Sequence, residues 1–536
     1  MLVLVIGQAA QAADYYWVED AGDWSELRHW ATTSGGTTKH KAVPTLNDQV
    51  FFDANSGDSI HTTIDVEQAY CRSMNWTGAL GAPTLSGTAE KAIHVFGSLT
   101  FVATLKQEFK GDFYFEGDHV GNLITSAGRI FNRNVHVDGS GSWTLADSLC
   151  VFNSFYFVRG NFSTANQQVF THSFLSREGN QRHLSLGKTY WTLRNQDPQN
   201  NARLEWAMNP VNLALDAGKS TIDFSNSSGS MMNGAGGPGL QYNVILFAGG
   251  DAQLSNQSKQ SQVFDTISCI GSLNSYGSNT TTVLKMLNVY QVFKINSNDT
   301  FSLAEWIVPK ACDGRIEMSS TSLQGQAYLH TTKAIAVQNL SIQDILRIGV
   351  GTATANNSID LGNNQGWIIN NKVGRDLYWV GKGGTGNWYE RANWASVSGG
   401  AGGECIPNDM DNVFFDVNSF DGPDQRVISR DQEAYCKNMS WTGVSNNPIN
   451  FDMWILNAYG SVDLPENKVG GISELRLLSP DQNQTLLTRG YHIYNALLNG
   501  AGSWILQDTL SATNLYQRSG EFNSNGKPVT TETFLC

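Results

Sequence analysis

Short apolar runs alternate with polar turns along almost the whole chain. In each run apolar and polar side chains alternate, and Gly, Asn, Ser or Asp separates it from the next. A period of two is typical of strands, because successive side chains point to opposite faces of a sheet. The runs recur at roughly 20-residue intervals, and the two-residue turns of tight hairpins are infrequent between them. The pattern predicts an all-β fold, a right-handed parallel β-helix (β-solenoid), with an array of β-sandwich domains as the alternative.

The chain contains the same unit twice. The stretch "YYWVEDAGDWSELRHW" at 15–30 returns as "LYWVGKGGTGNWYERANW" at 377–394. The likeness continues through "DQVFFDANS" and "DNVFFDVNS", then "EQAYCRSMNWTG" and "DQEAYCKNMSWTG", then "GSGSWTLADSL" and "GAGSWILQDTL". Repeats of this kind indicate an architecture built from stacked units. We expect units of about 360 residues, a first complete one at 14–376 and a truncated second one at 377–536.

The first residues predict export. "MLVLVIGQAAQAA" has a short apolar run followed by an A-x-A pattern, so we interpret 1–13 as the remnant of a signal peptide. No later stretch reaches the roughly 18 apolar residues of a membrane span. We therefore expect a secreted or cell-surface protein, outside the outer membrane, with no membrane span in this segment.

Composition excludes a nucleic-acid partner. Charged residues are only 15% of the chain, the net charge is −13, and no stretch collects Lys and Arg. Phosphate backbones are bound by such clusters. Gly is frequent, at 53 residues, as expected for many short strands joined by turns.

Catalytic motifs are absent from the sequence. No G-x-S-x-G, H-E-x-x-H or P-loop occurs, and Asp and Glu mostly stand in turns such as "NQDPQN". We predict a protein that is not an enzyme. The alternative is a polysaccharide lyase or glycoside hydrolase, whose carboxylates or basic residues would converge in a groove on one lateral face.

Paired Asp and Asn side chains after the "VFF" strands are candidate calcium ligands. They are Asp53 with Asn55 and Asp416 with Asn418, to which Asp48 and Asp411 add further oxygens. Calcium takes six to eight oxygen ligands, far more than each pair supplies. We favour the interpretation that Asp and Asn bond to the turn backbone, and we expect no cofactor.

The seven cysteines form no C-x-x-C pair, which disfavours zinc and thioredoxin-like chemistry. Cys405 and Cys436 come close if their strands lie side by side, so a disulfide is predicted there as an alternative to two buried thiols. Cys269 with Cys312 is a weaker candidate pair.

Four tryptophans form a repeated aromatic set, Trp24 and Trp30 in the first unit and Trp388 and Trp394 in the second. They offer either a platform for sugar rings or a packed cluster at the seam between the last coil of one unit and the first coil of the next. Their fixed spacing beside glycines favours packing.

The stretch "NNSIDLGNNQGWIINNKVGRDLYWVGKGGTGNWYERANWASVSGG" resembles the junction between units of large repetitive secreted surface proteins of Bacteroidota, which include gliding-motility-type adhesins and type IX secretion substrates. "VFFDANS", "MNWTG", "LDAGKSTIDF" and "YNVILFAGG" fit the same pattern. The resemblance implies export across both membranes, display at the cell surface and a β-solenoid stalk. The carboxy-terminal sorting domain of such substrates is not visible, which suggests a piece of a longer protein.

These observations together predict a non-enzymatic segment of a large exported cell-surface protein, an adhesin or a rigid stalk that presents adhesive sites. The expected partners are cell-surface or extracellular glycans or proteins, and the secretion machinery. The competing hypothesis is a carbohydrate-active or carbohydrate-binding β-helix protein.

Overall fold

The structure is a computed structural model that describes residues 12–196, 202–309, 315–322, 324–371, 373–381, 386–422, 425–429, 431–444, 450–466 and 469–536. Nearly all of it is β-structure, wound into a β-solenoid of about 21 turns. Strands pair in parallel with the corresponding strand of the next coil, which confirms the predicted parallel β-helix. The β-sandwich alternative is wrong, because a sandwich is built from antiparallel strands. Residues 1–11, most of the predicted signal peptide remnant, lie outside the described residues.

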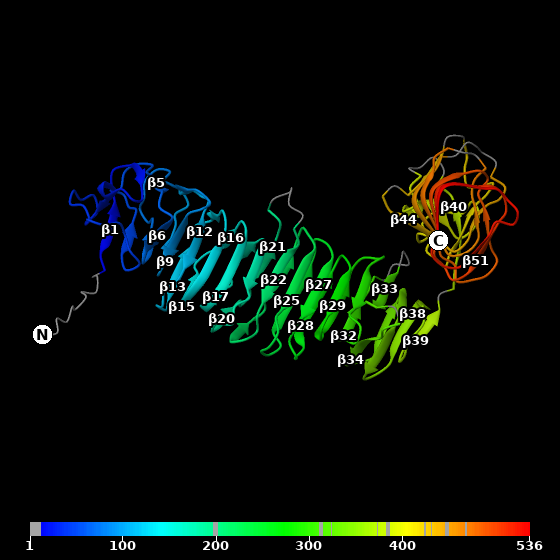
Figure 1. The fold of residues 1–536 in the computed structure, drawn as a ribbon, viewed down its shortest axis with the longest axis horizontal. Coiled ribbons are helices and arrows are strands. Elements are labelled where there is room, and N and C mark those ends of the chain that lie inside the picture. The colour runs from blue at the N-terminus through cyan, green and yellow to red at the C-terminus, as the bar shows by residue number, and fades with distance from the viewer. Residues whose placement is uncertain are drawn as a thin grey trace.

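The first solenoid runs from β1 (Asp14–Trp17) to β39 (Ile368–Asn371), from blue to yellow-green in Figure 1. Its longest sheet has 24 strands and follows the whole stack. A second face consists of a four-stranded sheet and then an 11-stranded sheet. The four strands are β2 (Ala21–Asp23), β5 (His61–Ile64), β8 (Thr84–Gly87) and β11 (Lys106–Phe109), and the 11-stranded sheet extends from β14 (Ile130–Phe131) to β37 (Ile345–Gly349).

Inward side chains of successive coils stack in columns along the core. One column consists of Val50, Met74, Leu99, Ile124 and Leu145, each in register with the next. It follows β4 (Gln49–Phe51), β7 (Ser73–Asn75), β10 (Leu99–Thr100), β13 (Asn122–Thr125) and β15 (Val135–Leu145). All five side chains are at most 2% exposed. Burial of each contributes about 1.5–3 kcal/mol, so the column helps to hold neighbouring coils together.

A second column lies on the outer side of the same sheet. Tyr70, His94, Tyr114, His136 and Tyr156 stack ring on ring, with centroids 4.8, 4.7, 4.2 and 4.5 Å apart. The rings follow the roughly 4.8 Å spacing of paired strands. Because each ring covers the face of its neighbour, the inner rings leave only their edges free. The column therefore braces the first coils from outside.

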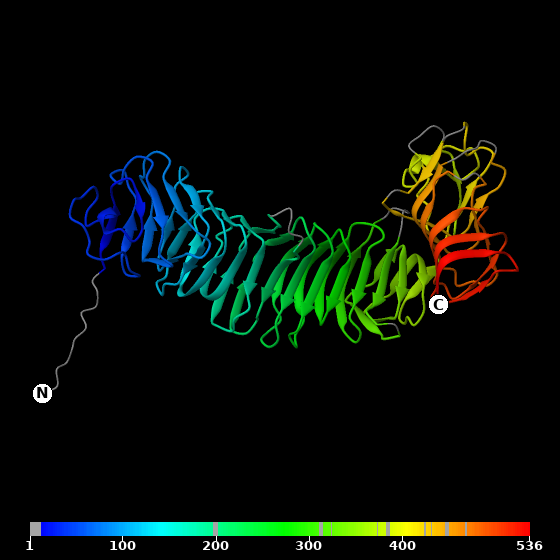
Figure 2. The ribbon, with the colours of Figure 1, turned by 45° about the horizontal axis from the view of Figure 1, so that its top comes forward.

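The second solenoid does not continue the stack of the first. It runs from β40 (Asp376–Trp379) to β54 (Val529–Leu535) and turns away from the end of the first solenoid (Figures 1 and 2). It has its own eight-stranded and seven-stranded sheets. Its buried apolar residues form a core separate from that of the first solenoid. The two units are therefore not stacked end to end on one core, contrary to the stacking of units that the repeats indicated.

The repeated tryptophans close the first coil of each solenoid. β1 pairs antiparallel with β3 (Trp30–Ala31), as β40 does with β41 (Trp394–Ala395). The indole Nε1 of Trp30 donates to the carbonyl of Trp24 at 2.8 Å, and Trp394 donates to Trp388 at the same distance. All four rings are at most 1% exposed, so they offer no platform to a ligand. They pack inside their own unit, which makes the predicted location at the seam wrong.

Glycines at three equivalent positions of the two units allow the backbones of neighbouring coils to touch. In the first unit they are Gly139, Gly141 and Gly160, and in the second Gly500, Gly502 and Gly520. A Cβ on Gly160 would lie 2.0 Å from the carbonyl oxygen of Gly139, and φ of Gly160 is +84°. Gly520 has the same environment, with φ of +76° and a Cβ position 2.2 Å from the oxygen of Gly500. The close backbone approach and the left-handed conformation both disfavour a side chain at these positions.

We expect Gly160→Ala to destabilise the first solenoid more than Gly128→Ala. Gly128 also has a positive φ, +75°, but open space around its Cβ position. The left-handed backbone costs about 1–2 kcal/mol in both variants, and crowding adds about 1–3 kcal/mol at Gly160 alone. Urea unfolding followed by circular dichroism measures both. Equal midpoints for the two variants would contradict the crowding at Gly160.

Candidate functional site

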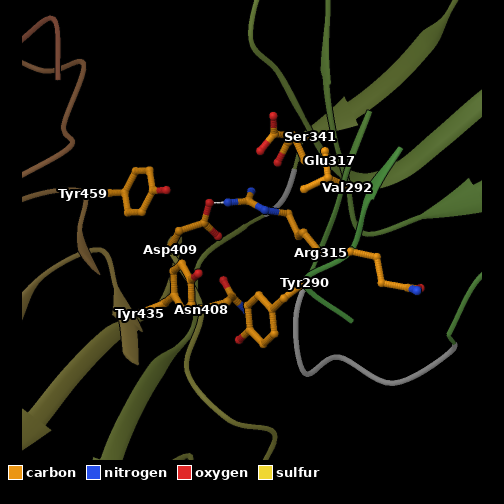
Figure 3. Close-up of a pocket in the computed structure, with 10 residues that line it drawn as sticks. Tyr290, Val292, Arg315, Glu317, Ser341, Asn408, Asp409, Tyr435 and Tyr459 are labelled. Carbon is orange, nitrogen blue, oxygen red and sulfur yellow. Dashed lines mark ion pairs between the residues drawn. The ribbon is translucent and has the colours of Figure 1, made fainter. Parts of the chain in front are cut away.

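The second solenoid packs against the side of the first. The Tyr290 ring of the first unit stacks on Tyr435 of the second, with centroids 4.8 Å apart and planes 12° apart. Arg315 of the first unit forms an ion pair with Asp409 of the second. The Arg and Asp side chains are only 10% and 5% exposed. The joint between the units is thus built from specific polar and aromatic contacts (Figure 3).

A cavity of about 190 Å³ lies at this joint, and we call it the inter-unit pocket. The first unit contributes β31 (Val292–Ile295), β33 (Ile316–Ser320) and β36 (Leu340–Gln343) or residues next to them. The second contributes β44 (Glu433–Cys436) and the segments before β42 (Asn412–Phe415) and after β46 (Asn450–Ala458). The lining residues are Tyr290, Gln291, Val292, Arg315, Glu317, Ser341, Asn408, Asp409, Tyr435 and Tyr459.

Burial determines the charge states at the pocket. Desolvation lowers the pKa of the Arg315 guanidinium to about 10, which leaves the group cationic at neutral pH. Desolvation, together with the Glu433 carboxylate, raises the pKa of the Tyr435 phenol, so this group is protonated. Burial also raises the pKa of the Tyr459 phenol. The pocket thus holds one buried cation, one buried carboxylate and neutral phenols.

Three buried polar atoms at the pocket have no hydrogen-bond partner within the described part of the chain. They are Nη1 of Arg315, Nδ2 of Asn408 and Oδ1 of Asp409. Asn408 is held by its turn, where its Oδ1 accepts from the N–H of Met410 at 3.0 Å and its own N–H donates to Asp411 at 3.1 Å. This leaves its Nδ2 donors unused. Nη1 of Arg315 and Oδ1 of Asp409 belong to the same ion pair, in which a bidentate contact would join these two atoms.

A second concave surface, the lateral groove, lies on the side of the first solenoid. It measures about 1260 Å³ and follows β8 and β11. Its lining residues are Thr63, Ser86, Gly87, Thr88, Ala89, Glu90, Gln107, Glu108, Lys110, Asn132, Arg133, Phe152 and Asn153. Thr63, Ser86 and Glu108 occupy one register column across three coils.

Four charged residues line the lateral groove, namely Glu90, Glu108, Lys110 and Arg133. A hydrogen bond from Thr88 lowers the pKa of Glu90, which is therefore ionised at neutral pH. Arg133 donates to the carbonyl of Ala89 and lies 3.4 Å from a carboxylate oxygen of Asp112. Acids and bases on adjacent coils are the arrangement we associated with the carbohydrate-active alternative. Sequence alone did not place them together.

The candidate calcium residues act on turns. Oδ1 of Asp53 accepts from the N–H of Asn55 at 2.9 Å, and Asp416 and Asn418 repeat this bond at the same distance. Both Asn side chains tie down a neighbouring loop, through Ser34 at 2.9 Å and Ser398 at 3.0 Å. No group of three or more His, Cys, Asp or Glu suited to a metal occurs among the described residues. The predicted bond to the turn backbone is thus present for Asp53 and Asp416, whereas the side chains of Asn55 and Asn418 bond to neighbouring loops instead.

Asp48 and Asp411 have a structural role common to both units. Asp48 accepts from the N–H of Ala13 at 2.9 Å, and Asp411 accepts from the N–H of Arg375 at 2.9 Å. Each aspartate lies in the next coil and thereby holds the start of the first strand of its solenoid. Arg375 adds a charged contact to Asp411, at 2.6 Å.

The predicted disulfide between Cys405 and Cys436 is wrong. Cys405 is disulfide-bonded, whereas Cys436 is a free, fully buried thiol of the second core. Cys436 points inward from β44, because side chains of one strand alternate between the two faces of its sheet. Cys269 is also a free buried thiol, so its predicted pairing is wrong as well. Cys312 lies outside the described residues.

The pocket residues were missed by sequence reasoning, although a signal existed. Asn408 and Asp409 correspond to Thr45 and Leu46 of the first unit, within "VPTLNDQVFF" and "IPNDMDNVFF". Tyr459 similarly corresponds to Phe96, within "HVFGS" and "NAYGS". At all three positions the second copy is more polar than the first. The sequence differences between the two copies at these positions therefore indicated where the two units contact each other.

We expect Asp409→Asn to loosen the joint while each solenoid stays folded. The variant leaves the Arg315 cation buried without its carboxylate, which costs about 3–5 kcal/mol. Small-angle X-ray scattering should show a broader range of particle dimensions. Glu205→Gln is the control, because it removes a surface ion pair with Arg177 whose partners are 24% and 57% exposed. Unchanged scattering for Asp409→Asn would contradict this role.

The buried thiols should resist modification. Burial raises the pKa of Cys71, Cys269 and Cys436, which disfavours the reactive thiolate. With a thiol reagent at pH 8, we expect Cys536, which is exposed, to react in the native protein. The three buried thiols should react only after unfolding, and mass spectrometry of labelled peptides distinguishes the sites. Rapid native labelling of Cys436 would show that the second core opens.

Comparisons with known proteins did not identify a family for this chain. A scan against family models, a search of curated proteins and a search of solved structures gave no match. Among the described residues, no helix has the length and apolar character that crossing a membrane requires. The resemblance to surface proteins of Bacteroidota therefore stays a prediction, and function is argued from the fold and its two concave sites.

Proposed function

We propose that this chain is a rigid, non-enzymatic segment of a large exported cell-surface protein, an adhesin or a stalk that presents adhesive sites. The observation that carries the proposal is the presence of two β-solenoids joined through a buried contact between them. Continuous ladders make each solenoid stiff along its axis. The buried ion pair between Arg315 and Asp409 and the stacked rings of Tyr290 and Tyr435 connect the two solenoids.

Such a segment acts through geometry and multiplicity. A stiff rod holds its binding surfaces at a fixed distance from its anchor, and repeated units carry several copies of each surface. Several such surfaces binding at once give a higher overall affinity than any single surface, although no new type of contact is made. The proposed partners are extracellular glycans or proteins, and the secretion machinery that exports the chain.

A carbohydrate-active or carbohydrate-binding function is the second candidate, and the lateral groove favours it. Glu108, Lys110 and Arg133 supply acidic and basic groups on adjacent coils. Phe152, which is 38% exposed, adds an apolar surface at the same groove. An extended polysaccharide fits these features, because sugars combine hydroxyl groups with apolar faces.

Binding and shape together test the first proposal. We expect the chain to bind selected glycans on an array, and scattering to show a bent particle with a fixed angle between two rods. Binding to immobilised cell-surface material by surface plasmon resonance extends the test to protein ligands. A fixed bent shape without binding to either material would leave a spacer and refute the adhesive role.

The groove variants separate the two candidates. Glu108→Gln and Lys110→Ala remove charges from exposed side chains, so folding should be unaffected. If the groove is catalytic, the wild type will release new reducing ends or unsaturated sugars from acidic polysaccharides, and the variants will not. Turnover by the wild type that both variants abolish would replace the non-enzymatic proposal with the second candidate.

A further inference from the structure

We infer that the outer face of the second solenoid binds a neutral, extended polysaccharide chain through a strip of outward side chains. The strip, which we call the aromatic strip, consists of Trp454, Ser473, Tyr494 and Thr513. The inference rests on the proposed adhesive function, and it names a site and a ligand class for it. The strip shares no residue with the inter-unit pocket or the lateral groove.

The four side chains of the strip come from four successive coils. Their strands pair in parallel and are β46, β48 (Ile472–Leu477), β50 (His492–Leu498) and β52 (Leu510–Gln517). Each strip residue follows a buried residue that is in register with its equivalents, namely Met453, Ile472, Ile493 and Ala512. Because side chains of a strand alternate between its two faces, the strip residues point outward. They form a column along the solenoid.

The two aromatic side chains of the strip lie open to solvent. Trp454 is 46% exposed and Tyr494 is 56% exposed. In the part of the chain that the structure describes, Trp454 is the only exposed tryptophan, and the other tryptophans of the second unit are at most 5% exposed. Apolar surface that stays in water does not stabilise the core. The two rings are therefore available to a ligand.

The strand that carries Trp454 is held firmly in place. Oγ of Ser429, in the coil before it, accepts from the N–H of Trp454 at 2.9 Å, and Ser429 is only 1% exposed. Met453 and Ile455, on either side of the tryptophan, are both buried. The ring is thus presented on a fixed backbone, so binding costs little backbone ordering.

The spacing of the two rings fits an extended sugar chain. Trp454 and Tyr494 lie two coils apart, which is about 10 Å at roughly 4.8 Å per coil. The two-residue repeat of a cellulose-type chain has about this length, and every second ring of such a chain presents the same face. The C–H face of a sugar packs on an aromatic ring. Ser473 is small, so it leaves room for the chain between the two platforms.

A cavity of about 380 Å³ lies beside Trp454, at one end of the strip. Its lining residues are Ile428, Asp431, Asp452, Trp454 and Ser473. Sites for small ligands measure about 300–1,000 Å³, so the volume is sufficient for a sugar ring. A ring that packs on Trp454 therefore also fills this cavity.

The charges beside the strip favour a neutral chain over an anionic one. Asp431 and Asp452 line the cavity and are exposed. Carboxylate oxygens accept strong hydrogen bonds from hydroxyl groups, whereas a uronic acid would bring a like charge next to them. The ring nitrogens of His492 lie 2.9 Å from Ser511 Oγ and 3.0 Å from Thr513 Oγ1, so this ring already has partners.

Both units have a concave surface at the same place in the coil. At the lateral groove of the first unit, Thr63 is in register with Ser86. The corresponding residues of the second unit, Ile428 and Asp452, are in register at the cavity beside Trp454. The concave surface is therefore a feature of the repeated unit, and the second copy lines it with an aromatic ring.

Hexasaccharides test the ligand class on the full chain. Calorimetric titrations use cellohexaose and mannohexaose, which are neutral and extended, and maltohexaose, which is neutral and coiled. Oligogalacturonate and a chitosan hexamer are the charged comparisons. We expect saturable binding of cellohexaose or mannohexaose and about tenfold weaker binding of the other three, since only an extended neutral chain meets both rings and the carboxylates. The matching methyl glycoside should bind more weakly than its hexamer, because it covers only one ring.

Variants of the two aromatic residues test the site. Trp454→Ala and Tyr494→Asn each remove one platform, so we expect about tenfold weaker binding for each. Asn132 of the first unit corresponds to Tyr494, within "RIFNRN" and "YHIYN", so the fold tolerates this residue. Tyr494→Phe keeps the ring, and its affinity should stay within about twofold. Thermal unfolding without ligand should be the same for all three variants as for the wild type, because both side chains are exposed.

Each other outcome overturns the inference in a distinguishable way. Equal affinity of the wild type, Trp454→Ala and Tyr494→Asn, or binding to the glycan array without binding of any hexamer, would place the adhesive site elsewhere while the proposed function stands. Equal or tighter binding of maltohexaose, oligogalacturonate or the chitosan hexamer that Trp454→Ala weakens would show that the ligand class is wrong. Failure of the wild type on the array, on cell-surface material and with every hexamer would refute the proposed function together with this inference.

Discussion

The parallel backbone ladder between successive coils is the constraint on which the rest of the structure depends. It sets a spacing of roughly 4.8 Å between equivalent residues, and the side chains of neighbouring coils must fit that spacing. The Val50 column inside the sheet and the Tyr70 column outside it both follow it. Where a coil approaches its neighbour more closely, as at Gly160 and Gly520, only glycine fits. Core, outer surface and turns are therefore consequences of one repeated geometry.

A ladder of this kind leaves its first strand without a partner on one side. Unpaired strand edges invite unwanted pairing, and both solenoids cover theirs in the same way. An antiparallel strand at Trp30 or Trp394 folds back over the first strand, and the indole rings fill the end of the core. With each solenoid closed at its start, the two units meet through their sides. The contact is consequently polar and contains a pocket, whereas stacked ends would have produced a continuous apolar core.

The two copies have diverged where their surroundings differ. The outer column that begins with Tyr70 in the first unit corresponds to the one that begins with Tyr435 in the second, and Asn457 follows where the first has His94. Tyr435 instead stacks on Tyr290 of the other unit. Residues that serve the ladder are unchanged, as Asp48 and Asp411 show, since both fix the opening strand. At the surface, by contrast, Tyr435 contacts the other unit, and the equivalent Tyr70 of the first unit instead stacks on His94 of its own unit.

The sequence by itself determined the repeat, the short strands and their parallel stacking, because these follow from local alternation and from turn residues at regular intervals. It also indicated that Asp53 bonds to the backbone of its own turn, an interaction within three residues, but not that the Asn55 side chain reaches Ser34 in another loop. Only the tertiary structure decided that Trp24 and Trp30 close a single unit, that Glu108 and Arg133 share a groove, and that Arg315 meets Asp409. The turns differ in length from coil to coil, so local sequence does not set the register between coils. The register, and therefore the position of the second solenoid, depends on packing contacts summed over many residues.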